Sequence, residues 1–455
     1  MKMAQGQTGP RTPPPVPETA TRGGESGAAR WGKLVLSPNS RLVWTEPMLA
    51  ALARGNNSRQ WHTLIDKVFA PKNLRLALET VTARKGAPGI DGQTTEAVKA
   101  RAEEEIALIA RLLQEGRYEP KAVRRTWIDK LGSAEKRPLG IPTVRDRIVQ
   151  SALLHLLEPI FERDFAEGSY GFRPGRSARQ AVEVVEQSLA RGCTWVVDAD
   201  LKGYFDSIPQ EKLLACVREK VADGRVLALL EKFLKQGVME TGKGWEPTSQ
   251  GTPQGAVISP LLANIYLDSL DHEMALRGRL MTRYADDFIL LCHSETEAQE
   301  ALAEVRQWVE AAGLTLHPEK TRIVNTAAGE SFEFLGWHFE RGYKWPREKS
   351  QQKFKETIRK RTVRHHGDAL PKVIARVNRV IRGWGNYFQG GVRNVPQKLE
   401  KWVRMRLRSI LRRRDGRRGR GRGLDHHRYP NAWLTARGLI SLSAITHGAA
   451  AGPAQ

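Results

Sequence analysis

Two short segments in which a β-type run ends in acidic residues constrain the fold of this chain more than any other feature. In residues 194–200, TWVVDAD, β-branched and aromatic residues lead into Asp198 and Asp200. Because side chains alternate across a strand, these two carboxylates share one face if the strand continues to Asp200. In residues 280–291, the adjacent acids Asp286 and Asp287 lie between two apolar runs, as at the tip of a β-hairpin.

Acidic side chains in such surroundings are costly unless something neutralises them. A divalent cation does so, and Mg²⁺ is usually held by one or two carboxylates together with substrate phosphates and water. Two ions about 3.5–4 Å apart can activate a 3′-hydroxyl and stabilise a leaving pyrophosphate. An isolated Asp-Asp pair is more often an ordinary turn, and nothing else supports a role for Asp198. The metal hypothesis therefore depends on Asp200 and on the residues between the two segments.

The residues between the two acidic segments include QGTPQGAVISPLLANIY, at positions 250–266. Its glycines allow a backbone to approach a nucleotide closely. Ser259 followed by Pro260 predicts a helix N-cap and first helical residue. The helix that follows is expected to present Leu261, Leu262, Ile265 and Tyr266 to a core.

The charge of the chain is concentrated near its C-terminal end. Of 73 Lys and Arg and 50 Asp and Glu, residues 1–340 hold 44 basic and 44 acidic residues, whereas residues 341–455 hold 29 and 6. A neutral body with a basic end predicts a separate surface for phosphates, and hence a polyanionic partner. The 40% hydrophobic content excludes a wholly disordered chain.

The sequence also predicts where the protein works. We expect a soluble cytoplasmic protein, because no secretory signal and no run of about 18 apolar residues is recognisable. Cys193, Cys216 and Cys292 are odd in number and far apart, which argues against disulfides and structural zinc.

Several local structures are predicted outside the acidic segments. Residues 1–45 are rich in proline and glycine and are expected to be disordered. Amphipathic helices are expected over 61–82 and 94–114, and a loop-rich basic region over 124–177. Two basic helices are expected over 372–388 and 397–414, followed by a flexible cationic segment in the tail, Arg417–Arg422.

The basic residues of the two C-terminal helices are spaced so that they gather on a face opposite the apolar residues. We expect them to contact nucleic acid phosphates. They are Arg376, Arg379 and Arg382 in the first helix and Arg404, Arg408 and Arg412 in the second.

Taken in order, the motifs closely resemble the reverse transcriptases encoded by bacterial group II introns. The resemblance covers about residues 60–440 and rests on blocks at 137–147 (RPLGIPTVRDR), 170–177 (YGFRPGRS), 200–206 (DLKGYFD), 251–255 (GTPQG), 284–287 (YADD), 313–321 (GLTLHPEKT) and 334–337 (FLGW). Residues 382–388 (RGWGNYF) resemble the thumb and maturase region of the same family.

The resemblance implies an α+β right-handed polymerase with an antiparallel palm sheet and a helical thumb. It implies an RNA template with a DNA primer, dNTPs and two Mg²⁺ ions, for which Mn²⁺ can substitute. The expected division is a disordered extension (1–45), an N-terminal extension with fingers (46–180), a palm (181–340), a thumb or maturase domain (341–415) and a basic nucleic-acid-binding tail (416–455).

Carried over position by position, the resemblance makes Asp200, Asp286 and Asp287 the metal ligands, with the Leu201 carbonyl as an additional ligand. Lys130 and Arg137 match positions that hold the incoming triphosphate, and Phe205 matches the side chain that excludes a 2′-hydroxyl. Gln254 matches a residue near the templating base pair.

Simpler roles remain open for several of these residues. Phe205 could be a core residue, Gln254 could only stabilise its loop, and Lys320, which matches a position near the primer, could be a surface lysine. Arg173 and Arg176 could contact the template or form structural ion pairs.

The family also implies that the basic end and the fingers bind the group II intron RNA and assist its splicing. Cysteine pairs of the C-terminal endonuclease found in many relatives are not recognisable here, which predicts insertion by reverse splicing and priming from an existing DNA end in the target. Two alternatives stay open: a splicing-only maturase with a silent polymerase site, and a reverse transcriptase domesticated for host defence or repair. The oligomeric state is not predicted.

Overall fold

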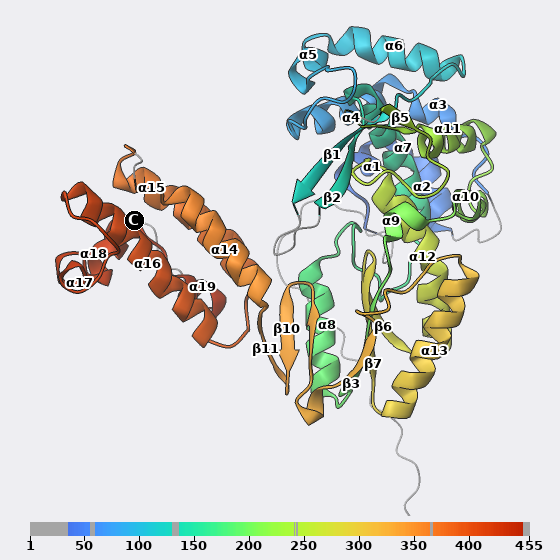
Figure 1. The fold of residues 1–455 in the computed structure, drawn as a ribbon. Helices are drawn as coiled ribbons and strands as arrows, with labels where there is room; N and C mark the ends of the chain where they lie inside the picture. Colours follow the sequence, from blue (N-terminus) through green and yellow to red (C-terminus); the bar gives the residue numbers. More distant parts are fainter. Residues whose placement is uncertain are drawn as a thin grey trace, which may run out of the picture.

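The computed structural model describes residues 35–54, 60–129, 136–240, 242, 244–364 and 367–448. Figure 1 shows a large body of mixed helices and strands, and a helical arm that stands apart from it. The arm joins the body through β10 (Trp337–Glu340), β11 (Tyr343–Pro346) and α14 (Glu348–Arg361). We call the arm the thumb, after the region that the sequence predicts there. Among the described residues, no helix is both long and apolar enough to cross a bilayer.

The palm sheet is antiparallel throughout and has the order β6-β7-β3-β8. Its strands are β3 (Trp195–Asp200), β6 (Leu280–Tyr284), β7 (Asp287–Cys292) and β8 (Arg322–Asn325). The predicted strand and hairpin are confirmed, since β3 continues to Asp200 and only Ala285 and Asp286 separate β6 from β7.

Helices cover both faces of the palm sheet (Figure 1). Val197 and Ala199 of β3 belong to the large core that includes α12 (Ser259–Leu276) and α13 (Glu295–Ala311). Val196 packs on the other face with α8 (Ala178–Ala190) and strand β9 (Ser331–Phe334). Asp198 and Asp200 alternate with Val197 and Ala199, so they lie on the α8 side and share one face, as predicted.

A second sheet, the fingers sheet, has the order β2-β1-β4-β5 and lies above the palm sheet in Figure 1. Its strands are β1 (Val123–Asp129), β2 (Lys136–Ile141), β4 (Val238–Glu240) and β5 (Gly244–Glu246). A third sheet, β11-β10-β9, leads into the thumb. It consists of β9 (Ser331–Phe334), β10 (Trp337–Glu340) and β11 (Tyr343–Pro346).

The helices around the fingers sheet share one continuous core with the palm. They are α1 (Pro38–Val43), α2 (Glu46–Ala53), α3 (Ile65–Val68), α4 (Pro71–Ala83), α5 (Thr95–Ala100), α6 (Ala102–Gln114), α7 (Val144–Glu162), α9 (Tyr204–Ser207), α10 (Gln210–Arg218) and α11 (Gly224–Lys235). A short 3₁₀ turn, Thr326–Ala328, follows β8.

Five local predictions in the body need correction. The helix predicted over 94–114 is two helices, α5 and α6, which are separated at Arg101. Residues 38–45 are not disordered, because α1 forms there and Trp44 is buried in the core. The helix predicted over 61–82 is divided at Pro71, which starts α4. Residues 124–177 are not mainly loop, since they contain β1, β2 and the buried helix α7. Ser259 is the first helical residue rather than the N-cap, and its hydroxyl donates to the Pro253 carbonyl.

The thumb has a core of its own. Its long helices α14 (Glu348–Arg361), α15 (Leu370–Tyr387) and α16 (Asn394–Arg414) are followed by the short helices α17 (Leu424–Arg428), α18 (Asn431–Thr435) and α19 (Leu442–Thr446). Leu434, Leu439 and Leu442 are buried against the long helices. Residues 416–448 therefore do not form the flexible tail that the sequence predicts, because apolar residues after the arginines fold back onto the thumb. Nucleic acid binding by this segment stays a prediction.

Candidate active site

Three acidic residues meet where β3 ends and the β6–β7 hairpin turns. The sheet register places Asp200 directly opposite Asp287, and Asp286 lies in the turn beside them. Two segments that are about 85 residues apart in the sequence are thus joined by backbone pairing, as the acidic pattern suggested but could not establish.

The electrostatics of these acids indicate closely spaced negative charges. Burial raises the pKa of Asp287 to about 7, and repulsion from Asp198, Asp286 and Asp200 adds to the effect. Burial and the charge of Asp200 also raise the pKa of Asp286, while Arg137 and Lys320 counteract the rise. Like charges held this close favour a cation between them.

The donor set fits magnesium. Among the described residues, no three His, Cys, Asp or Glu side chains lie close enough together to hold a metal ion by themselves. Mg²⁺ does not need such a set, since it uses one or two carboxylates and takes its other ligands from substrate phosphates and water. Asp200, Asp286 and Asp287 are oxygen donors of the required kind. The Leu201 carbonyl follows directly on Asp200, and its role as a ligand stays a prediction.

The turn that carries Asp286 is strained and firmly supported. Ala285 adopts a positive φ of 60°, a conformation that costs a non-glycine residue roughly 1–3 kcal/mol. Arg283, which is fully buried, donates to the Ala285 carbonyl at 2.9 Å and to Asn264 Oδ1 at 3.0 Å. The charge of Arg283 is balanced by Asp271, whose Oδ1 lies 2.7 Å from Arg283 Nε.

A glycine completes the support of this turn. A Cβ at Gly171 would lie 2.3 Å from the Ala285 nitrogen, so no larger residue fits without displacement. The Gly171 carbonyl also accepts a hydrogen bond from Asn264 Nδ2 at 2.7 Å. Our sequence reading missed the positioning roles of Arg283, Asp271 and Asn264. A signal existed, because an arginine inside an otherwise apolar strand requires a buried partner.

Two of the residues predicted to contact substrates, Arg137 and Lys320, lie close to the acids. Arg137 is exposed on β2 and lies close enough to Asp286 for its charge to counteract part of the rise in the pKa of that residue. Phe205 is half-buried on α9, where it packs edge-on against Tyr204. Lys320 Nζ lies 2.5 Å from Asp200 Oδ2, so it belongs to the acidic site rather than to an uninvolved surface. Lys130 falls outside the described residues.

The loop of residues 251–255 joins the palm to the fingers sheet. The Gln254 carbonyl accepts a hydrogen bond from the Gly140 nitrogen at 2.7 Å, and the Thr252 nitrogen donates to the Phe205 carbonyl. A Cβ at Gly255 would lie 2.5 Å from the Gly140 carbonyl oxygen. The glycine therefore permits approach to a β-strand backbone, whereas the sequence suggested approach to a nucleotide.

Two of the predicted nucleic acid contacts are structural residues instead. Arg173 is buried and forms an ion pair with Glu162, 2.9 Å apart, which settles the open alternative for this residue. Arg408 is 3% exposed, and its guanidinium donates to the Tyr429 carbonyl and to Asn431 Oδ1. Both guanidiniums are bonded to internal partners. The structure therefore supports the ion-pair alternative for Arg173, and Arg408 is too buried to contact RNA as predicted.

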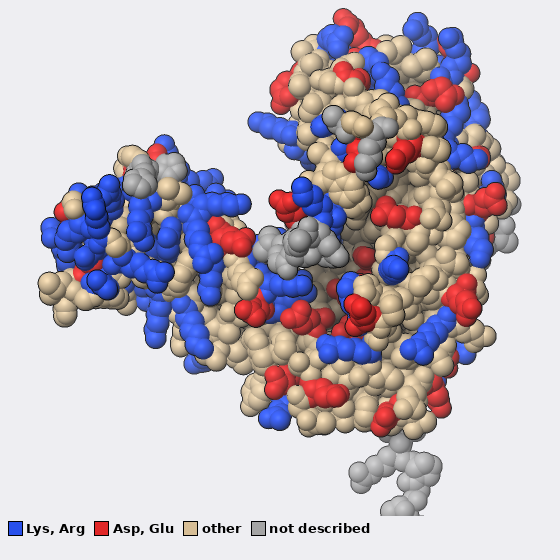
Figure 2. Space-filling view, in the orientation of Figure 1, with Lys and Arg blue, Asp and Glu red and all other residues tan. Residues whose placement is uncertain are grey.

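Other predicted contacts are partly available. Arg176 is half-buried over the Tyr170 ring, and Arg412 pairs with the buried Asp425 at 2.9 Å. Arg376 pairs with Asp368, and Arg404 pairs with Glu400. Arg379 and Arg382 are exposed on α15. Figure 2 shows basic side chains crowding the thumb, across a deep hollow from the body, where the two signs of charge mix.

The fold and site define a class: an RNA-dependent DNA polymerase domain joined to a maturase domain. Residues 128–339 match the family model described as "Reverse transcriptase (RNA-dependent DNA polymerase)". Residues 351–429 match "Group II intron, maturase-specific domain". The chain belongs to the group II intron reverse transcriptase/maturase family.

Individual relatives agree with this assignment. Protein YkfC of Escherichia coli is 36% identical over 330 residues, which span 63% of this chain and 85% of YkfC. Group II intron-encoded protein LtrA of Lactococcus lactis is 38% identical over 234 residues, which span 50% of this chain but 38% of LtrA. A solved telomerase from Candida albicans shares 13% identity over 70% of this chain and 64% of its own, with a TM-score of 0.40.

Proposed function

We propose that this protein copies RNA into DNA from a primer and also binds a group II intron RNA to assist its splicing. The observation that carries the polymerase proposal is the register of Asp200 against Asp287, with Asp286 in the adjoining turn. The body and arm then act as the fingers, palm and thumb of a right hand, and the RNA–DNA duplex lies in the hollow of Figure 2.

In this proposal Asp200, Asp286 and Asp287 hold two Mg²⁺ ions, for which Mn²⁺ can substitute. When bound, the ions supply activation of the primer 3′-hydroxyl and charge stabilisation for the leaving pyrophosphate. Arg137 binds the phosphates of the incoming dNTP from the fingers side, as its proximity to Asp286 supports. Lys130 is proposed for the same role by resemblance alone.

Three further residues are proposed to position the substrates. Phe205 lies directly after the acidic strand, where its ring packs under the sugar and leaves no room for a 2′-hydroxyl. Lys320, already beside Asp200, holds the primer end near the acids. Gln254 lies in the loop that bonds to β2, which places it between the fingers and the palm.

The maturase proposal is supported by the charge of the thumb. Residues 341–455 contain 29 basic and 6 acidic residues. Arg379 and Arg382 are exposed on the same helix, while Arg376, Arg404 and Arg412 are each tied to a carboxylate and make weaker candidates. We propose that this surface binds intron RNA, and that the protein works in the cytoplasm of a bacterium, near the nucleoid. We also propose that it supports insertion into target DNA by reverse splicing and target-primed synthesis.

A splicing assay tests the maturase proposal. The RNA flanking this reading frame is transcribed and its splicing is measured at low Mg²⁺ with native protein and with an Arg379→Ala, Arg382→Ala variant. Native protein should accelerate splicing, and the variant should bind more weakly with a salt slope reduced by about one to two. Arg306→Ala, which removes an exposed arginine from α13 outside the thumb and the fingers, serves as the control.

The outcomes separate the competing functions. Splicing that is unaffected by native protein would reject the maturase proposal and leave a reverse transcriptase that serves another process, such as defence or repair. Faster splicing without any primer extension would instead identify a splicing-only protein.

A further inference from the structure

Four arginines of the thumb gather without carboxylates around them. Arg359 lies on α14, Arg364 follows that helix, Arg406 lies on α16, and Arg420 lies in the loop of residues 416–423. In the part of the chain that the structure describes, no acidic side chain forms an ion pair with any of the four. We call them the arginine cluster, and the function proposed above gives them no role.

The charges of the arginine cluster act on one another. Burial lowers the pKa of the half-buried Arg406 guanidinium, and the charges of Arg364, Arg359 and Arg420 lower it further. Like charges held together in this way disfavour the charged form of each group, and an anion among them removes the repulsion. The arrangement therefore indicates a place for an anion.

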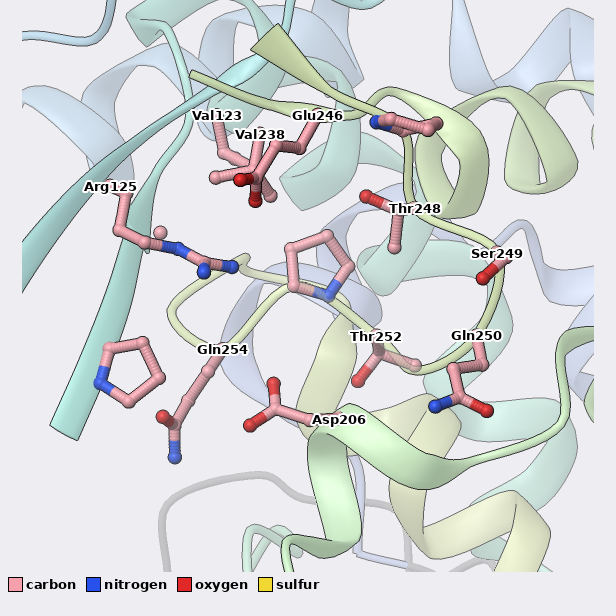
Figure 3. Close-up of a pocket in the computed structure, with 14 residues that line it drawn as sticks. Val123, Arg125, Asp206, Val238, Glu246, Thr248, Ser249, Gln250, Thr252 and Gln254 are labelled. Atoms are coloured by element: carbon pink, nitrogen blue, oxygen red, sulfur yellow. The ribbon is translucent and has the colours of Figure 1, made fainter. Parts of the chain in front are cut away.

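Elsewhere the protein supplies its arginines with counter-ions. Arg376 on α15 pairs with Asp368, 2.6 Å away. Figure 3 shows Arg125 in the pocket beside the fingers sheet, which is also lined by Asp206 and Glu246. The charge of Arg125 counteracts the rise that burial causes in the pKa of Asp206. The arginine cluster lacks such carboxylates, so its counter-ion has to come from a ligand.

Two side chains of the cluster are held in position without a ligand. Arg406 Nε donates to Thr362 Oγ1 at 3.1 Å, and Arg406 Nη2 donates to the Thr362 carbonyl at 2.7 Å. Arg359 Cζ lies 5.6 Å from the centroid of the Trp402 ring. Side chains that are already ordered lose less conformational entropy when a ligand binds.

Close packing of the loop of residues 416–423 brings Arg420 to the cluster. The Gly421 nitrogen donates to Ser409 Oγ at 2.9 Å. A Cβ at Gly421 would lie only 2.5 Å from Arg408 Cβ, so no larger residue fits there without displacement. The backbone next to Arg420 is therefore fixed against α16.

The number of charges decides which kind of anion fits. A guanidinium binds phosphate oxygens through paired, charge-assisted hydrogen bonds. A backbone phosphodiester carries one negative charge, so a single one cannot balance four arginines. A basic groove for a nucleic acid backbone follows successive phosphates, whereas here three arginines surround a fourth. A diphosphate or triphosphate group offers several negative charges within one ligand.

We propose that the arginine cluster binds a diphosphate or triphosphate group. Two molecules carry this chemistry: free pyrophosphate, which a DNA polymerase releases, and the 5′-triphosphate end of an RNA transcript. The bound group bridges α14, α16 and the loop of residues 416–423, so it also stabilises the C-terminal part of the thumb. The inference does not depend on the proposed roles of the acids in the palm.

Calorimetric titration with pyrophosphate tests the proposal. Native protein is titrated without divalent metal with pyrophosphate, orthophosphate or sulfate at equal ionic strength. Pyrophosphate should bind at least about tenfold more tightly than the two smaller anions, because it gains at least one more charge-assisted hydrogen bond. Arg406→Met and Arg420→Met should each weaken pyrophosphate binding at least about tenfold for the same reason.

Arg393→Met is the matched control. Arg393 is an exposed arginine at the N-cap of α16, roughly 20 Å from Arg406 along the helix. This variant should bind pyrophosphate like native protein. Melting temperatures check folding, and because Arg420 is exposed, Arg420→Met carries the test if Arg406→Met does not fold.

Two RNA oligonucleotides that differ only at the 5′ end distinguish the sources of the group. Tighter binding of the 5′-triphosphate form than of the 5′-hydroxyl form, lost in Arg406→Met, would identify an RNA end as the ligand. Tight pyrophosphate binding without this preference would identify free pyrophosphate. Either result supports the proposal.

Three results would overturn it. The first is pyrophosphate binding no tighter than that of sulfate. The second is pyrophosphate binding that both cluster variants retain and Arg137→Met loses, which would place the anion beside the acids of the palm. The third is RNA binding that the cluster variants weaken equally for both 5′ ends and that pyrophosphate does not compete with, which would assign the cluster to the RNA backbone.

Discussion

The buried ion pair between Arg283 and Asp271 should be a main support of the acidic turn. Both side chains are almost completely buried, at 0% and 1% exposed. Arg283 also donates to Ser169 Oγ at 2.9 Å and to the Ala285 carbonyl at 2.9 Å. Replacing it by methionine keeps a long apolar stem but leaves a buried carboxylate and several acceptors unpaired.

The magnitude follows from the asymmetry of buried ion pairs. Removing one partner costs about 3–5 kcal/mol of unfolding free energy, because the other charge stays uncompensated. We expect this loss for Arg283→Met. The double variant Arg283→Met, Asp271→Leu should lose less unfolding free energy than the two single variants together, because neither charge remains buried. It should still lose some, because the Ala285 carbonyl lacks its donor. Primer extension should fall in both variants, because the turn that carries Asp286 loses its anchor.

Denaturant unfolding of the native chain, both single variants and the double variant gives the required cycle. Arg277→Met is the control, since its pair with Glu273 is surface-exposed and worth about 0.3–0.5 kcal/mol. The role of the ion pair would be refuted if the losses of unfolding free energy were additive. It would also be refuted if Arg283→Met unfolded with a free energy within about 1 kcal/mol of native protein.

Three further predictions concern the same site. In metal-free buffer, the pKa of Asp287 is about 7 against an ordinary 3.8, so this residue contributes stability that is present below pH 4 and lost as the pH rises through 7. Asp287→Asn should therefore melt at a higher temperature than native protein at pH 8. Melting temperatures that change equally with pH in the two proteins would contradict this. Phe205→Ala should raise ribonucleotide incorporation, measured as the ratio of kcat/KM for NTP and dNTP, and an unchanged ratio would return Phe205 to a purely packing role. Gly171→Ala should cost about 1–3 kcal/mol and reduce extension because its Cβ would collide with Ala285, whereas Gly224→Ala, where a Cβ meets nothing within 4 Å, should do neither.

Much of the site could be predicted because it depends on local pattern. The strand that ends at Asp200 and the hairpin that presents Asp286 and Asp287 follow from the two-residue alternation of apolar side chains. The family resemblance grouped Asp200, Asp286 and Asp287 as metal ligands, but the long-range register that places Asp200 opposite Asp287 was not predicted and comes from the structure.

The errors share a physical cause, which is that charge in a sequence does not reveal burial. Arg173 and Arg408 have the same local appearance as exposed arginines, but each meets an internal partner brought from another segment. The arginine-rich stretch after residue 416 suggested a tail, yet Leu434 and Leu442, farther along the chain, bury themselves against α15 and α16. Such contacts become visible only when the fold is known.

Primer extension tests the central claim most directly. Native protein and an Asp286→Ala, Asp287→Ala variant are compared on an RNA template with a DNA primer, Mg²⁺ and dNTPs, with a known reverse transcriptase as the positive control. The account predicts that native protein extends the primer, that the variant still binds the primer–template but does not extend it, and that EDTA stops the native reaction. Equal extension by both proteins, or none by native protein while the control is active, would contradict the assignment of catalysis to these acids.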